Sequence, residues 1–369
     1  MISLPPLSCS EGITPLRKAH AFFLRWSLFL TTTVEKEERS YLVSKKHDKL
    51  VKTTGRGTLM NVTQQQLEEL IAECRPYTVL GQVASYIPEL AKSEPTQLGI
   101  AVCNADGTFV SAGDAETMFT LQSVSKIITL AFVLETFGED YVFSKVGMEP
   151  TGDAFNSIAK LEETIPTKPL NPMINAGALA VTSMLPGEDA ADKLNQLRQF
   201  IADLLDIELD MVKYDAEVAK SEFETTDLNR ALLYFMRYHG VIEGNVEEII
   251  DVYTKQCAIL TNCKGLAMMG KILSQSGKTP SGRQVISRRN ARIIRAIMTT
   301  CGMYDASGEF SVQVGLPGKS GVSGAIVACG RSDFDMADLG IGIFGPALDL
   351  KGNSIAGTKM LELLVQRHP

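Results

Sequence analysis

Strand-like segments lie near both ends of this 369-residue chain, and a long, mostly helical region separates them. Residues 98–103 and 108–111 flank an Asp-Gly turn, which predicts a β-hairpin. Near the C-terminus, residues 325–329 and 339–344 are short apolar runs of strand length. Because strands must pair to satisfy their backbone groups, we expect an α+β fold: one antiparallel sheet built from both chain ends, with flanking helices and a helical insert at about 139–300.

Other elements follow from capping and periodicity. Thr63 and Gln66 form a capping box that predicts a helix through Cys74. Apolar spacing predicts a further strand at 310–314 and further helices at 189–206, 226–239, 246–274, 287–300 and 354–366.

The motif with the clearest chemistry is Ser123-Val-Ser-Lys126, which precedes an apolar helical run. Residues three apart share a helix face, so the Ser123 hydroxyl and the Lys126 amine should point into one cavity. A serine becomes a nucleophile when a neighbouring base takes its proton, and an amine is such a base only when it is neutral. Lowering a lysine pKa from about 10.4 to about 7 requires an enclosed site. We therefore expect Ser123 to be the nucleophile and Lys126 its activating partner.

Ser-x-x-Lys is a weak pattern by itself. A second copy, Ser157-Ile-Ala-Lys160, lies in a polar stretch and is interpreted as solvated surface. Ser125 would lie on a different side of the helix from Ser123, which makes it the poorer candidate for the nucleophile.

Composition excludes several classes of function. No uncharged apolar run approaches the roughly 18 to 20 residues of a membrane span, so no membrane partner is expected. The 7 cysteines and 4 histidines are scattered without metal-ligand spacing. We therefore expect a cytoplasmic protein with mostly buried thiols and with no zinc site or histidine-based metal centre.

Residues 1–59 differ from the rest of the chain. They carry ten Lys and Arg against five Asp and Glu, whereas the remaining residues carry 26 against 38. The acidic body makes a nucleic-acid partner unexpected. A mitochondrial presequence within residues 1–34 stays open. We favour the interpretation that residues 1–59 are a disordered or non-native extension before Met60, and that 60–369 is one catalytic domain.

The order of motifs resembles that of the penicillin-binding and serine β-lactamase fold. In that group a serine opens a helix, a lysine lies one turn on, and a Lys-Thr/Ser-Gly strand closes the site. Here the strand motif is Lys319-Ser-Gly321. The usual Ser-x-Asn triplet is missing from this sequence, which weighs against β-lactam hydrolysis and transpeptidation.

Six motifs in register are similar to those of the serine-dependent glutaminases of the compact bacterial type. They are Tyr86-Ile-Pro-Glu-Leu-Ala91, Leu121-Gln-Ser-Val-Ser-Lys126, Asn171-Pro-Met-Ile-Asn-Ala-Gly177, Ser221-Glu222, Gly302-Met-Tyr-Asp-Ala-Ser-Gly308 and Gly315-Leu-Pro-Gly-Lys-Ser-Gly-Val322.

The resemblance implies hydrolysis of L-glutamine to L-glutamate and ammonia through a γ-glutamyl ester on Ser123, in a homodimer or homotetramer and without a cofactor. It assigns catalytic roles to Ser123, Lys126, Tyr253 and Tyr304. It assigns substrate contacts to the same serine and tyrosines and to Tyr86, Asn175, Glu222, Asn229 and Val322. The sequence leaves open which tyrosine acts as a base.

Two other functions remain possible from the sequence. One is a Ser-x-x-Lys amidase or β-lactam-reactive protein, and the other is a binding module that keeps the fold without the activity. The missing Ser-x-Asn triplet disfavours the first, and the presence of both Ser123 and Lys126 disfavours the second.

Overall fold

The computed structural model describes residues 61–152, 157, 161, 168–330 and 338–368. The expectation for residues 1–59 and the lysine of the second Ser-x-x-Lys pattern, Lys160, lie outside these described residues. Within the described part, no helix is both long and apolar enough to cross a membrane.

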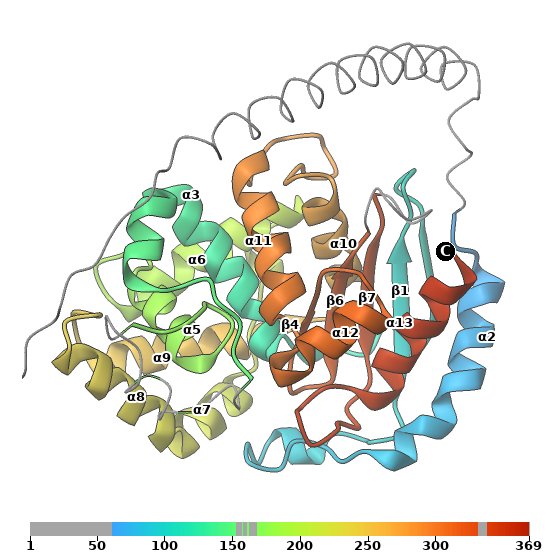
Figure 1. Ribbon diagram of the computed structural model, residues 1–369, viewed down its shortest axis with the longest axis horizontal. Coiled ribbons are helices and arrows are strands. Elements are labelled where there is room, and N and C mark those ends of the chain that lie inside the picture. Colours follow the sequence, from blue (N-terminus) through green and yellow to red (C-terminus); the bar gives the residue numbers. More distant parts are fainter. Residues whose placement is uncertain (1–60, 153–156, 158–160, 162–167, 331–337, 369) are drawn as a thin grey trace, which may run out of the picture. The chain divides into compact units, whose positions relative to one another are not determined.

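A five-stranded antiparallel sheet lies to one side of the compact unit that begins at Leu59, with most of the helices to its left in Figure 1. Its strands are β1 (Gly99–Cys103), β2 (Phe109–Gly113), β5 (Gly318–Ser320), β6 (Ala325–Cys329) and β7 (Gly340–Phe344). They are ordered β2-β1-β7-β6-β5, so the late strand β7 pairs directly with the early strand β1. The predicted sheet from both ends of the domain is confirmed.

Both faces of the sheet are covered by helices. Alternate residues of a strand point to opposite faces, and in β1 Ala101 packs with α10 (Cys263–Ser274) in one core. Ile100 packs in a second core with α2 (Gln64–Cys74) and α13 (Ile355–Arg367). The capping box of Thr63 and Gln66 starts α2 as predicted. This double burial explains why the central strands are continuous apolar runs.

Helix α10 packs directly against the backbone of β7 at Gly342. A Cβ atom built on Gly342 would lie 2.1 Å from the carbonyl oxygen of Cys263 at the start of α10. Any larger residue there would push the helix away and open the core beneath it.

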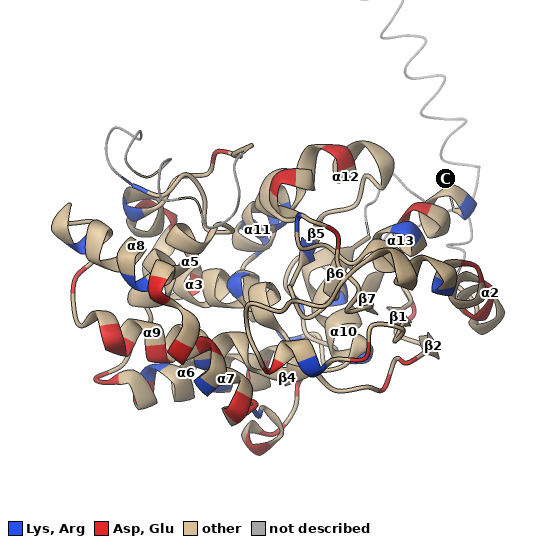
Figure 2. Ribbon diagram, turned by 90° about the horizontal axis from the view of Figure 1, so that it is seen from below, with Lys and Arg blue, Asp and Glu red and all other residues tan. Residues whose placement is uncertain are grey.

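Helices make up most of the region between the early and late strands (Figure 1). Besides α10 and the short α12 (Ser307–Gln313), the described helices of this region are α3 (Ser125–Lys145), α5 (Asn175–Ser183), α6 (Ala190–Leu205), α7 (Ala216–Thr225), α8 (Asp227–Tyr238), α9 (Val246–Cys257) and α11 (Arg288–Cys301). Acidic residues gather on α7 and α9 (Figure 2), in line with the acidic balance of the chain after residue 59.

Helix α3 changes direction at Gly138, which has φ of 79°. The helix breaks at this glycine, and a second helical segment continues to Lys145. Only a residue without a side chain adopts this left-handed conformation readily.

Two predicted elements are wrong. Residues 246–274 form two helices separated by β4 (Leu260–Thr261), which pairs with β3 (Phe119–Thr120). Residues 310–314 do not form a strand, because they continue α12 (Ser307–Gln313).

Candidate active site

Ser123 lies in a tight 3-10 turn, Gln122–Val124, directly before α3. Gln122 has φ of 47°, in the left-handed region that residues other than glycine rarely adopt. The residue before it, Leu121, is fixed by donating its backbone N–H to the Ile259 carbonyl at 2.8 Å. Ser123 is only 7% exposed. The neighbouring structure thus holds a strained turn that presents the serine at the start of a helix.

Lys126, in the first turn of α3, is completely enclosed, with 1% of its surface exposed. Its Nζ donates to the Met173 carbonyl at 3.2 Å and to Asn175 Oδ1 at 2.7 Å. Burial lowers the pKa of Lys126 to about 8, and the negative charge of Glu222 opposes part of this shift. Roughly a tenth of such amines are neutral at pH 7, which is enough for a general base.

Tyr304 is the hydrogen-bond partner of Ser123. Its hydroxyl is bonded to the Ser123 hydroxyl and donates to the Ser320 carbonyl at 3.4 Å. Burial raises the pKa of Tyr304 far above its usual value, so its hydroxyl is neutral. The Lys319 amino group lies 4.3 Å from the centre of the Tyr304 ring. Like Gln122, Tyr304 has a left-handed backbone, with φ of 55°.

Glu222, on α7, places an unsatisfied carboxylate oxygen in the site. It is 8% exposed, and its Oε2 atom has no hydrogen-bond partner among the described residues. Burial raises the pKa of Glu222 to about 8, while the charge of Lys126 and a hydrogen bond with the Gln122 side chain work in the opposite direction. Buried acceptors in a protein core are nearly always hydrogen-bonded, so a buried acceptor without a donor indicates a ligand site.

Two asparagine side chains extend the network from Lys126. Asn175 lies at the first position of α5, and its Nδ2 donates to Asn229 Oδ1 at 3.0 Å. Asn229, on α8, in turn donates to Thr226 Oγ1 at 2.6 Å. Each asparagine NH₂ group therefore has a second N–H left over, and two such donors lie side by side.

Tyr253, on α9, is 2% exposed and lies near Glu222 and Tyr304. Burial raises its pKa well above the usual value, and the neighbouring Cys257, Glu222 and Tyr86 raise it further. Tyr253 is also hydrogen-bonded to the Cys257 thiol. It is therefore a neutral phenol, like Tyr304.

Tyr86 and Val322 lie at the open side of the site. Both line a cavity of about 730 Å³. Although 57% of the Tyr86 surface is exposed, its hydroxyl end is enclosed near Tyr304 and Glu222, and this enclosure raises the pKa of Tyr86. The cavity therefore reaches the site at these two residues, and the buried groups do not line it.

The structure brings all nine predicted residues into one region, whereas their functional roles stay predictions. Sequence reasoning assigned no role to two further residues of the region. Gln122 contacts Glu222, and Lys319 lies against Tyr304. Gln122 belongs to the Leu121–Lys126 motif and Lys319 to the Gly315–Val322 motif, so motif membership pointed to both residues. Spacing along the chain does not reveal which partner a side chain contacts.

The strand that carries Lys319 closes directly over the serine turn. A Cβ atom built on Gly321 would lie 2.6 Å from the Leu121 carbonyl oxygen and 3.4 Å from the Ser123 backbone nitrogen. We expect Gly321→Ala to displace the turn and to lower kcat about 100-fold, because a misplacement of about 1 Å is enough for that loss.

The matched control for this substitution is Gly308→Ala, where the added methyl group meets nothing within 4 Å. Steady-state kinetics and a thermal unfolding midpoint should be measured for both variants. A folded Gly321→Ala protein with unchanged kcat would contradict the close approach as a constraint on the site.

Comparison with known proteins places the chain in a family. A sequence model described as Glutaminase matches residues 81–368. This chain belongs to the glutaminase family. A glutaminase of Exiguobacterium sp. is 66% identical over 310 residues, which cover 84% of this chain and 99% of that protein.

Solved glutaminase structures share the fold. A crystal structure of a probable glutaminase from Bacillus subtilis is 42% identical, has a TM-score of 0.76, and is matched over 82% of this chain and 96% of that one. A covalent complex of Bacillus subtilis glutaminase YbgJ with 5-oxo-L-norleucine, formed from 6-diazo-5-oxo-L-norleucine, is 40% identical with a TM-score of 0.75 and is matched over 82% of this chain and 97% of that one. The family resemblance, the assignment as an enzyme and the β-lactamase-like α+β fold are confirmed.

The described residues of this glutaminase contain no group of three or more His, Cys, Asp or Glu side chains arranged to hold a metal ion. Six of the 7 cysteines are described, and all six are buried and outside disulfides.

Proposed function

We propose that this glutaminase hydrolyses L-glutamine to L-glutamate and ammonia through a γ-glutamyl ester on Ser123. The observation that carries the proposal is the arrangement around the serine: its hydroxyl is bonded to Tyr304, and three residues on, in the first turn of α3, lies a buried lysine with a pKa of about 8. The glutaminase family model and relatives support the same substrate.

Recognition of glutamine follows from complementary charge. The unsatisfied Oε2 of Glu222 can accept a hydrogen bond from the α-ammonium group of the substrate. The spare N–H donors of Asn175 and Asn229, with the Tyr86 hydroxyl, can bind the α-carboxylate. Glutamine would then lie with its side-chain amide toward Ser123.

Acylation begins with transfer of the Ser123 proton to the neutral amine of Lys126. The serine oxygen forms a bond to the amide carbon, and the carbonyl electron pair moves onto its oxygen. When the electron pair returns, the C–N bond breaks, and the nitrogen leaves as ammonia after taking a proton from the Lys126 ammonium. Water then attacks the ester carbon and gives a proton to Lys126. When the C–O bond to Ser123 breaks, the Lys126 ammonium returns this proton to the serine oxygen, and glutamate is released.

Tyr304 and Tyr253 act as neutral hydrogen-bonding groups in this scheme. Because burial raises the pKa of both phenols, neither is ionised to serve as the initial base. Tyr304 orients the Ser123 hydroxyl through the hydrogen bond between them. Lys126 is the group whose pKa suits proton acceptance near neutral pH.

The oxyanion of the tetrahedral intermediate would be held by the backbone N–H groups of Ser123 and Val322. The close approach of Gly321 to the Ser123 nitrogen supports this pairing. Removing one such donor typically lowers kcat by about 10²–10³-fold.

The pH profile tests the role of Lys126. Lys126 must lose its proton to act as a base, and Glu222 must lose its proton to bind the substrate ammonium, so kcat/KM should rise with pH through about 8. Below that pH the rise should be steeper than about tenfold per unit, because two groups titrate in the same direction.

Lys126→Met should lower kcat by about 10⁴-fold, as the loss of a catalytic base does elsewhere.

Ammonia release measured from pH 5.5 to 9.5 gives the profile. Lys220→Met, on the exposed surface of α7, is the matched control and should retain the wild-type curve. A flat profile in the wild type, or appreciable turnover by Lys126→Met, would rule out this lysine as the proton acceptor.

We further propose that residues 60–369 form one catalytic domain, that the enzyme acts as a homodimer or homotetramer, and that it works in the cytoplasm. The buried thiols among the described residues support a reducing compartment. Size-exclusion chromatography with light scattering would test the assembly.

A further inference from the structure

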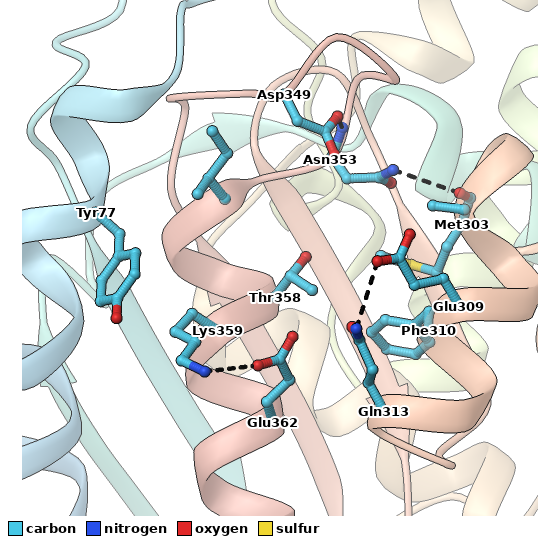
Figure 3. A pocket seen from close by; sticks show the side chains of 12 residues that line it. Tyr77, Met303, Glu309, Phe310, Gln313, Asp349, Asn353, Thr358, Lys359 and Glu362 are labelled. Atoms are coloured by element: carbon cyan, nitrogen blue, oxygen red, sulfur yellow. Dashed lines mark hydrogen bonds and ion pairs between the residues drawn. The ribbon is translucent and has the colours of Figure 1, made fainter.

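A second cavity lies away from Ser123, between α12, α13 and the segment that follows α2 (Figure 3). It has a volume of about 430 Å³. Phe310, Met303 and Ile355 contribute apolar walls, and the Tyr77 ring lies at one side. The volume is large enough for a small organic molecule and exceeds what a few waters require.

Two buried oxygen atoms in this cavity have no partner among the described residues. They are Asn353 Oδ1 and Thr358 Oγ1. Asn353 is only 2% exposed, and both side chains point into the same space (Figure 3). An amide oxygen can only accept hydrogen bonds, so the missing group must supply N–H or O–H donors.

The charge of the lining defines the missing group further. Glu309, Asp349 and Glu362 face the cavity, against one cation, Lys359. Lys359 donates to Glu362 at 2.8 Å, and the other oxygen of this carboxylate faces Thr358 (Figure 3). These three carboxylates and one ammonium sum to −2, and Lys351, which lies outside the lining and pairs with Glu309 at 3.7 Å, reduces the balance to −1.

We propose that this cavity binds a small alkylammonium ion. The ammonium group would donate to Asn353 Oδ1 and Thr358 Oγ1 and would be attracted by Glu362, while its methylene groups would pack against Phe310 and Ile355. The apolar walls favour an alkylammonium ion over free ammonium, which would leave them in contact with water.

A ligand in this cavity would lie close to the catalytic tyrosine. Asn353 Nδ2 donates at 3.4 Å to the carbonyl of Met303, the residue before Tyr304. On the same loop, a Cβ atom built on Gly352 would lie 3.5 Å from the Tyr304 ring and from Val322. Asp349 lines both this cavity and the cavity that Tyr86 and Val322 line. A bound ligand that orders Asn353 would therefore hold Tyr304 in place and raise kcat, an effect that rests on the proposed role of Tyr304.

Isothermal titration calorimetry of the full chain with 1,4-diaminobutane tests the site without turnover. We expect one ion bound per chain, with potassium chloride at equal ionic strength giving no signal and ammonium chloride binding at least about tenfold more weakly. Thr358→Val removes only the unpartnered hydroxyl and should weaken binding at least about tenfold. Thr136→Val, whose hydroxyl bonds to a backbone carbonyl in the exposed part of α3, should bind as the wild type does.

Glu362→Gln provides a second test that keeps the side-chain shape and should also weaken binding. Failure of the diamine to bind at up to about 10 mM would overturn the proposal, as would equal affinities for wild type and Thr358→Val. Either result would mean that water alone satisfies Asn353 Oδ1 and Thr358 Oγ1. If the diamine binds but kcat for glutamine stays unchanged, the site stands and its coupling to Tyr304 is overturned.

Discussion

Ser123→Ala should lower kcat for glutamine by at least about 10⁴-fold while glutamine binding stays measurable, since removal of a catalytic serine has effects of this size or larger elsewhere. The lost group is the atom that forms the acyl bond, and the groups proposed to bind the substrate ends are untouched. The hydroxyl fills little space beside Tyr304, so the fold should persist. Ammonia release gives kcat, and calorimetry with glutamine gives the affinity.

Ser125→Ala is the matched control for this substitution. Ser125 belongs to the same Ser-Val-Ser motif, but its hydroxyl donates to the Gln122 carbonyl at 2.8 Å and lies 3.9 Å from the Cys257 thiol. We expect Ser125→Ala to stay within about tenfold of the wild-type kcat, because it loses one neutral hydrogen bond. If Ser125→Ala is the inactive variant and Ser123→Ala retains activity, the nucleophile has been misassigned.

A covalent probe separates nucleophilic from merely structural roles of Ser123. The reagent 6-diazo-5-oxo-L-norleucine forms the covalent complex reported for the Bacillus subtilis relative. Mass spectrometry should find this label on the wild type and on Ser125→Ala, within the peptide that contains Ser123, and should find none on Ser123→Ala. A label attached elsewhere would exclude the γ-glutamyl ester on Ser123.

Glu222→Gln should raise KM for glutamine by about 10²–10³-fold with a smaller change in kcat. Removing one partner of a buried charge pair typically weakens binding by several kcal/mol, and about 1.4 kcal/mol corresponds to each factor of ten. The loss falls on the substrate ammonium, far from the reacting amide, so binding should suffer more than chemistry. Steady-state kinetics with glutamine at high concentration separates the two parameters.

Glu222→Gln should also change the pH profile. The carboxylate of Glu222 raises the pKa of Lys126, so its removal should lower that pKa and shift the rise of kcat/KM to lower pH. The rise should also become shallower, because one of the two titrating groups is gone. Glu224→Gln, exposed on the same helix, is the control and should change neither KM nor the profile. A wild-type KM in Glu222→Gln would remove this residue from substrate recognition.

The errors in the predicted elements have specific causes. In residues 310–314 the apolar side chains at 310, 312 and 314 alternate as in a strand, but Val312 is 87% exposed while Phe310 and Val314 are buried. The pair at i and i+4 is therefore the core face of a helix. In residues 246–274 the apolar pattern runs on through Leu260–Thr261, and only pairing with a strand more than 130 residues earlier makes that segment extended.

Local signals would have corrected part of the second error. Asn262 caps α10 by accepting a hydrogen bond from the Gly265 N–H. Asparagine is a preferred residue at this position, so a helix start in the middle of the apolar run could have been predicted. No local signal predicts the β3-β4 pair, because each strand has only two residues.

The sequence by itself determined the sheet from both chain ends, the helix that begins after Ser123, and the identity of the groups that gather at the site, since these depend on periodicity, capping and motif order along the chain. The tertiary structure decided what those groups touch. Tyr304 reaches Ser123 and Glu222 keeps an unsatisfied oxygen because distant elements pack around them. Burial, and with it the pKa of Lys126, is a property of the enclosing layers rather than of the lysine's neighbours in sequence.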